Sequence, residues 1–140
     1  MTRLSLGLCL FAAACGEPSA TAFTATVRMD ALLADEVQDL ALHVFGPKRT
    51  DGVFLTCGNL MDRVIAPADT RLDSLGSLRV ALADLTNQSV ELDSISAGSY
   101  RILYGEATDA SSTVLANGCT DRITVASGKT TEVPLDLFGF

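Results

Sequence analysis

The fold class is decided by residues 98–137, which read GSYRILYGEATDASSTVLANGCTDRITVASGKTTEVPLDL. Apolar residues of one parity recur along two runs of this stretch: Cys119, Ile123 and Val125, then Thr131, Val133, Leu135 and Leu137. A period of two predicts β-strands with one apolar face. Asn117-Gly118 predicts a tight hairpin turn, and Ser127-Gly128-Lys129 separates the last two predicted strands. Because Pro134 has no amide donor, we expect the last strand at a sheet edge.

The preceding residues show the same alternation, with turn signals about every 8 to 12 residues, as is typical of an all-β sandwich. The further predicted strands cover residues 23–29, 40–44, 53–57, 78–82, 90–92 and 100–104. Residues 31–37 also fit helical spacing, with Asp30 as N-cap, and we expect a loop or a single helical turn there. Residues 59–76 are expected to form an irregular crossover between the sheets. The prediction is therefore one sandwich of about seven to eight strands.

Residues 90–137 resemble the C-terminal half of an immunoglobulin-like or prealbumin-like sandwich, as in carboxypeptidase regulatory-like domains of bacterial surface proteins. The resemblance rests on Ala97-Gly98-Ser99-Tyr100, on Val114-Leu115-Ala116-Asn117-Gly118, and on the ending between Val125 and Leu135. It implies an antiparallel β-sandwich. Because such domains are mostly non-catalytic modules, it implies binding rather than catalysis.

The first seventeen residues, MTRLSLGLCLFAAACGE, have the layout of a bacterial export signal. Arg3 precedes an apolar run of about 11 residues, which is too short to span a bilayer as a helix. Small side chains precede Cys15, and this arrangement resembles the lipobox of bacterial lipoproteins. We expect a signal peptide over residues 1–14, a lipidated Cys15 with a short tether over 15–20, and a domain over 21–140. The alternative is cleavage by the general signal peptidase, which would leave a secreted protein.

The cysteine count agrees with lipidation. Of four cysteines, Cys9 leaves with the signal peptide and Cys15 would carry lipid. Cys57 and Cys119 then remain, and two cysteines in an oxidising compartment can form a disulfide with no thiol left over. The alternative is that both are buried free thiols.

The net charge and the expected lipid anchor limit which partners and which location are expected for the chain. The net charge is −7 and becomes −8 once residues 1–14 leave. An acidic chain disfavours nucleic acid and adhesion to anionic lipid, so membrane attachment would depend on the N-terminal lipid. By resemblance to the sorting rule of Gram-negative lipoproteins, Gly16 after the cysteine favours the outer membrane. A tether of six residues reaches at most about 20 Å, so the domain is expected close to the membrane surface.

The sequence indicates no catalytic site and no cofactor. His43, the single histidine, is expected as a solvated residue on the outer face of a strand. There is no Gly-x-Ser-x-Gly elbow, no zinc-ligand spacing and no glycine-rich phosphate loop. Asp69, Asp73 and Asp109 could in principle bind calcium, but acids in turns more often accept local backbone hydrogen bonds.

We therefore expect a non-catalytic envelope module that binds or assembles with a partner protein of the envelope. The alternative is a lipoprotein that binds a small ligand or a carbohydrate, and an enzyme is the third hypothesis. Carbohydrate binding usually needs exposed aromatic rings. There is no tryptophan, and Tyr100 and Tyr104 share a parity that is expected to face the core. A concave pocket that contains these tyrosines would favour the ligand-binding alternative.

Overall fold

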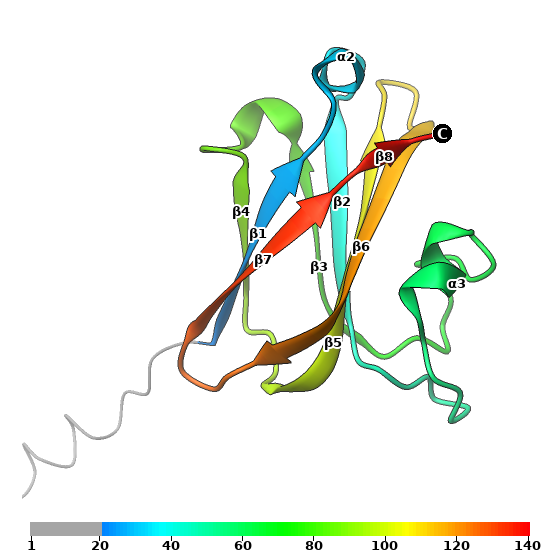
Figure 1. Cartoon of the computed structure of the whole chain (residues 1–140), viewed down its shortest axis with the longest axis vertical. Helices are drawn as coiled ribbons and strands as arrows, with labels where there is room; N and C mark the ends of the chain where they lie inside the picture. The colour runs from blue at the N-terminus through cyan, green and yellow to red at the C-terminus, as the bar shows by residue number, and fades with distance from the viewer. Residues whose placement is uncertain (1–20) are drawn as a thin grey trace, which may run out of the picture.

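The computed structural model describes residues 21–140, whose strands form two sheets that face each other (Figure 1). Among these residues there are eight strands, and the predicted all-β sandwich is confirmed. The predicted signal peptide, Cys15 and the tether lie outside the described residues. No helix within 21–140 is long and apolar enough to cross a bilayer.

The smaller sheet has three strands in the order β4-β1-β7. These are β1 (Ala22–Arg28), β4 (Ser89–Asp93) and β7 (Thr130–Asp136). β1 runs antiparallel to β4 but parallel to β7. The sandwich was expected to be antiparallel throughout, and this one pair of strands departs from that expectation. Parallel neighbours need a long connection, and here nearly the whole domain lies between the two strands. β7 pairs only with β1 in this sheet, which confirms the edge position predicted from Pro134.

The larger sheet has five strands in the order β3-β2-β5-β6-β8, and its neighbours are antiparallel. The strands are β2 (Asp39–Phe45), β3 (Ser74–Ala81), β5 (Gly98–Thr108), β6 (Val114–Val125) and β8 (Phe138–Gly139). A 3-10 turn, η1 (Leu82–Asp84), follows β3. The single helical turn predicted before β2 is α2 (Ala31–Ala34), and the Asp30 side chain caps it by accepting from the Leu32 amide.

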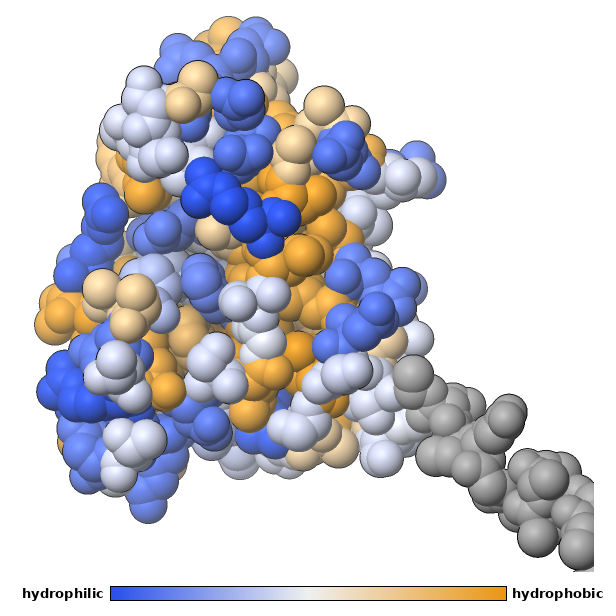
Figure 2. Space-filling model, turned by 180° about the vertical axis from the view of Figure 1, so that it is seen from behind, coloured by the Kyte–Doolittle hydropathy of each residue, from blue (hydrophilic) through white to orange (hydrophobic). Residues whose placement is uncertain are grey.

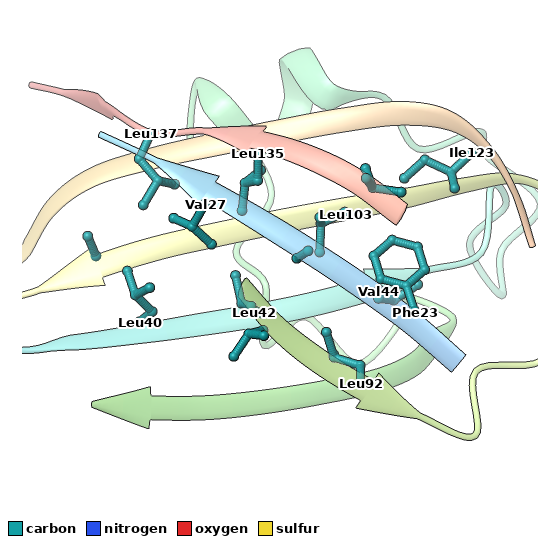
Figure 3. Close-up of a cluster of buried hydrophobic side chains, with 14 of the residues drawn as sticks. Phe23, Val27, Leu40, Leu42, Val44, Leu92, Leu103, Ile123, Leu135 and Leu137 are labelled. Atoms are coloured by element: carbon teal, nitrogen blue, oxygen red, sulfur yellow. The ribbon is translucent and has the colours of Figure 1, made fainter. Parts of the chain in front are cut away.

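The main core fills the space between the two sheets (Figure 3). Val27 of β1 lies on the side of Leu40 and Leu42 of β2, Phe23 of β1 is drawn beside Val44, and all five are almost completely buried. Leu103 of β5 and Leu135 of β7 complete its centre. These positions follow the alternation in the sequence, because each strand places every second side chain on the buried face.

The predicted hairpin turn at Asn117-Gly118 is wrong, because β6 continues through both residues. The β5–β6 turn instead lies at residues 109–113, where the Asp109 carboxylate accepts from the amides of Ser111 and Thr113 at 2.8 and 3.0 Å. Gly118 is required for another reason: a Cβ there would collide with the backbone carbonyl of Asp136 on β7. The glycine thus permits a close approach of two backbones rather than a turn.

The strand predicted over residues 53–57 is also absent. Residues 46–73, here called the excursion, connect β2 to its neighbour β3 within the same sheet. The expected crossover between the two sheets is therefore wrong. The excursion contains one short helix, α3 (Cys57–Met61), capped by the Thr56 side chain. Figure 1 shows α3 beside β6, away from β1.

The excursion covers the outer face of the larger sheet with a second apolar cluster, here called the outer-face cluster. It consists of Phe45, Leu55, Leu60, Ile65, Leu72, Ile102 and Tyr104. Alternation cannot reveal this cover, because the residues of the excursion follow neither a strand nor a long helix. As a result, the middle of β5 is buried on both faces.

Candidate binding site

The excursion is fixed to the sheet by the disulfide predicted from the cysteine count. Cys57 at the start of α3 is bonded to Cys119 of β6, with Cα atoms 5.6 Å apart. Both cysteines pack against the outer-face cluster. Cys119 therefore faces the excursion, whereas Ile123 and Val125 face the main core, so the predicted common face of these three residues is wrong.

A pocket of about 510 Å³ opens next to this disulfide. Its lining comes from three segments: Pro47, Phe54, Leu55 and Thr56 of the excursion, Tyr100 and Ile102 of β5, and Asp121 and Arg122 of β6. This volume lies within the range of small-molecule sites, which are mostly apolar with a few polar groups. The pocket is thus the place where a ligand would contact both the excursion and the sheet.

Two β-bulges frame the pocket. In the first, β5 has one more residue than β6 between the pairs Gly98–Val125 and Arg101–Ile123. Tyr100 lies in this bulge with a φ of 56°, a left-handed conformation that is rare for a bulky residue. Tyr100 is 65 % exposed.

The second bulge lies in β6, which has one more residue than β5 between the pairs Arg101–Ile123 and Leu103–Thr120. Arg122 has a φ of 55° in this bulge. Successive residues of a regular strand point to opposite faces, but here Asp121 and Arg122 both line the pocket. Bulges commonly re-aim side chains beside functional sites.

The two tyrosines have opposite environments, contrary to the expectation that both face the core. Tyr104 is completely buried, in the outer-face cluster rather than between the sheets. Tyr100 instead lines the pocket together with a second exposed aromatic residue, Phe54, which is 67 % exposed. The Lys48 ammonium lies 5.6 Å from the centre of the Phe54 ring.

A buried polar cluster lies farther along β5. The Tyr104 hydroxyl donates to Glu106 Oε1 at 2.8 Å, and it accepts from Asn117 Nδ2 at 3.3 Å. Asn117 also donates to the Met61 carbonyl at 3.1 Å, which links β6 to α3. Burial raises the pKa of Tyr104 to about 12, so its phenol stays protonated at neutral pH. The cluster is therefore a set of satisfied hydrogen bonds.

His43 is on the outer face of β2, as predicted, but it is half-buried rather than solvated. Its ring is stacked on Phe45 with centroids 5.7 Å apart and lies 6.5 Å from the Tyr104 ring. Burial lowers the pKa of His43 below its ordinary value of 6.5, while the Glu106 carboxylate acts in the opposite direction. His43 is thus a packed aromatic residue of the sheet.

The acidic residues considered for calcium make local interactions. Asp69 accepts from the Arg71 amide and guanidinium at 2.9 and 2.7 Å, and these bonds lower the pKa of its carboxyl. Asp109 caps the β5–β6 turn, as described above, and the Asp73 carboxylate lies against Gly46. Within residues 21–140, no three histidine, cysteine or acidic side chains come close enough together to hold a metal ion.

Sequence reasoning missed Phe54, Asp121 and Arg122 as site residues. Phe54 was part of an expected strand, and nothing in a run of alternating residues distinguishes an exposed ring from a buried one. The only signal at Asp121-Arg122 is a pair of adjacent charges before Ile123, which leaves the register of β6 undetermined. The bulge is visible only once the partner strand is known.

No protein-family model matches this chain, and no curated protein matches it either. Among solved structures, the chain is similar to the full-length major pilin SpaD from Corynebacterium diphtheriae, with 11 % identity and a TM-score of 0.37 over 86 % of this chain and 30 % of the pilin. It is similar to a fimbrial assembly protein from Parabacteroides distasonis, with 10 % identity and a TM-score of 0.39 over 88 % of this chain and 54 % of that protein. It is also similar to the pilus-presented adhesin Spy0125, with 12 % identity and a TM-score of 0.32 over 86 % and 27 % of the two chains.

The chain thus spans less than two thirds of the length of each of these three proteins. Their identities and TM-scores are low, and the similarity carries no conclusion about binding or assembly by this chain.

Proposed function

We propose that this chain is a lipid-anchored protein of the bacterial cell envelope whose sandwich is a non-catalytic binding module. The observation that carries the proposal is the pocket between the excursion and β5–β6, where two bulges present Tyr100, Asp121 and Arg122 beside Phe54. A concave site with aromatic walls and a few polar groups is suited to binding. The polar residues near it, Tyr104 and Asn117, are occupied by hydrogen bonds to each other and to neighbours.

The anchor is supported by the sequence of residues 1–17 and by the pairing of Cys57 with Cys119, which leaves Cys15 free for lipid. More than one acyl chain is needed for stable membrane attachment. The test is replacement of Cys15 with Ala, followed by acyl labelling and membrane fractionation. We expect both labelling and membrane retention to be lost, whereas Cys9→Ala is the matched control that changes neither. Unchanged labelling of Cys15→Ala would disprove the anchor.

The binding role is tested by placing a photo-crosslinking amino acid at position 100 in cells, with position 138 as the control. Phe138 is similarly exposed, at 61 %, but lies on β8 outside the pocket. We expect crosslinks to an envelope component from position 100 that disappear in an Arg122→Ala background. Equal crosslinking from both positions would show that the pocket has no special role.

A second candidate function is assembly with another envelope protein through the β3 and β4 edges. Within the described sheets β3 pairs only with β2, and β4 only with β1. The half-buried residues Leu75, Val80 and Leu85 pack at the margin of the main core. Figure 2 shows a band of apolar atoms on the rear face of the molecule. An unpaired edge beside apolar side chains can accept a strand from a partner.

This second function predicts that Leu78→Lys, on β3, abolishes co-purification of a partner from crosslinked envelopes. Leu78 is 37 % exposed. Val64→Lys is the matched control, because Val64 is an exposed apolar residue of the excursion. If both variants retain the partner, the β3 edge is not the contact.

A further inference from the structure

We infer that the pocket binds a neutral saccharide. This inference rests on the proposed binding function and adds the chemical class of the ligand. Tyr100 and Phe54 are each about two thirds exposed and line the same pocket. The electron-rich face of an aromatic ring attracts the weakly positive C–H groups that a sugar ring presents on its face. Two rings in one site therefore suit a ligand with flat C–H surfaces.

The polar side chains of the pocket suit the edge of a sugar ring. A hydroxyl group both donates and accepts, and it is best satisfied where an acceptor and a donor lie side by side. Asp121 supplies only acceptors and Arg122 only donors. Their charges are opposite and cancel within the lining, whereas Lys48, whose ammonium lies beside the Phe54 ring, is not among the residues that line the pocket.

Among the arginines of residues 21–140, Arg122 alone has neither a polar partner nor an aromatic ring beside its guanidinium group. Its side chain forms no salt bridge and no side-chain hydrogen bond with any residue in 21–140, and the same holds for Asp121. The remaining arginines between 21 and 140 contact partners as follows: Arg28 with Asp136, Arg49 with Asp51, Arg63 with Phe140, Arg71 with Asp69, Arg79 with Asp39, and Arg101 with Ala97. The two charged side chains that line the pocket thus have no partner within residues 21–140 and remain available to a ligand.

The backbone around these residues supports a built site. Both Tyr100 and Arg122 adopt positive φ, at consecutive bulges on either side of the Arg101–Ile123 pair. Conformations of this kind cost free energy and tend to persist where the surrounding structure or a function requires them. The disulfide beside the pocket fixes the excursion, and therefore Phe54, relative to the sheet.

The experiment uses the mature protein in detergent, titrated with neutral oligosaccharides of two to four hexose units and followed by NMR and calorimetry. Oligosaccharides that carry uronic acids or sulfates serve as the charged comparison. We expect the neutral ligands to bind and to perturb the Tyr100 ring resonances, but not those of Tyr104. Tyr100→Ala and Arg122→Ala should weaken binding about tenfold or more, as truncation of a hot-spot residue does.

Two variants serve as controls. Tyr100→Phe keeps the ring and should retain most of the affinity, whereas Phe138→Ala removes an exposed ring outside the pocket and should change nothing. The urea midpoint of each variant shows that the fold is intact.

The outcomes separate the inference from the proposed function. The saccharide inference is overturned if no neutral oligosaccharide binds, if binding is unchanged in Tyr100→Ala and Arg122→Ala, or if the charged oligosaccharides bind better. In those cases Arg122-dependent crosslinking from position 100 would still support a binding module with another ligand. If position 100 forms no crosslinks and no saccharide binds, both the saccharide inference and the proposed binding function are overturned.

Discussion

At the residue scale, the two buried polar side chains of Tyr104 and Asn117 connect the excursion to the sheet. Asn117 is 3 % exposed, and its side-chain amide donates hydrogen bonds to both the Tyr104 hydroxyl and the Met61 carbonyl. When a buried polar group loses its hydrogen-bond partner, its desolvation free energy is no longer offset, and the folded state is destabilised. The cluster should therefore contribute to stability as a unit.

Asn117→Ala should lower the free energy of unfolding by about 1–3 kcal/mol, because it leaves the Met61 carbonyl and the Tyr104 hydroxyl without this donor. Urea denaturation measures the change. Thr124→Ala, on the exposed face of the same strand, should stay within about 0.5 kcal/mol of wild type. In a double-mutant cycle with Tyr104→Phe the two losses should not add, and strict additivity would show that the bond contributes nothing.

His43 gives the domain a pH dependence with a defined sign. Burial lowers the pKa of His43 in the folded state below its ordinary value of 6.5, so at intermediate pH the unfolded chain binds more protons. Stability should therefore be complete above about pH 7 and fall as the pH decreases through 6.5 toward the folded-state pKa. Urea midpoints at pH 7.5 and 5.5 measure this loss. His43→Gln should have a smaller difference between the two midpoints, and an unchanged difference would refute the assignment to His43.

At the element scale, β5 and β6 carry most of what distinguishes this sandwich. Their pairing contains three register shifts. The two beside the pocket are bulges, one on each strand, which cancel each other in register and turn Tyr100, Asp121 and Arg122 to the pocket. Farther along β6, Gly118 allows the backbone to approach β7 closely. A single strand thus serves the core, the disulfide and the candidate site at different points of its length.

Gly118→Ala should destabilise the protein by about 1–3 kcal/mol, since a methyl group would collide with the Asp136 carbonyl, a backbone atom that cannot rotate away. Thermal or urea unfolding measures the effect. Gly58→Ala in α3 is the matched control, because the nearest atom to its added Cβ would be Thr56 Oγ1 at 3.7 Å. If the two variants are equally stable, the close approach of β6 and β7 is not as tight as the structure has it.

The sequence predicts the regular strands well and the site poorly, for a physical reason. Alternation identifies β1, β2 and β4 because each has one face in the main core, as Phe23, Leu42 and Leu92 show. Alternation fails at Tyr104, where both faces of β5 are buried, and at Arg122, where a bulge changes the register of β6. Asn117-Gly118 is misread because the dipeptide fits a turn as well as it fits a crowded strand. The pocket depends on pairing and on the path of the excursion, which no local pattern encodes.

At the scale of the whole molecule, the disulfide holds together two parts that are far apart in sequence. Cys57 and Cys119 are separated by 62 positions and join the excursion to β6. The excursion lacks regular strands, so its position depends on the outer-face cluster and on this bond. Four of the residues that line the pocket belong to the excursion.

The Cys57→Ser, Cys119→Ser double variant should lose roughly 2–4 kcal/mol of stability, because the unfolded chain regains the freedom that the loop closure removes. Urea denaturation of the variant and of the oxidised and reduced wild type measures this loss. The reduced wild type should match the variant. Ligand affinity at the pocket should fall as well, and equal midpoints for oxidised and reduced protein would show that the bond does not constrain the fold.

The parallel pairing of β1 with β7 imposes an order on folding. Ala22 lies between Asp93 of β4 and Thr130 of β7, so the first strand of the domain has its neighbours only in the later half of the chain. Such non-local pairing is slow to form, since the closure of long loops precedes the contacts that reward it. A chain that is translocated from its N-terminus onward would deliver β1 first and its last partner at the end. If the chain is exported as residues 1–17 predict, the three-stranded sheet would therefore be completed only after residues 130–136 have crossed the membrane, and until then β1 would lack its β7 neighbour.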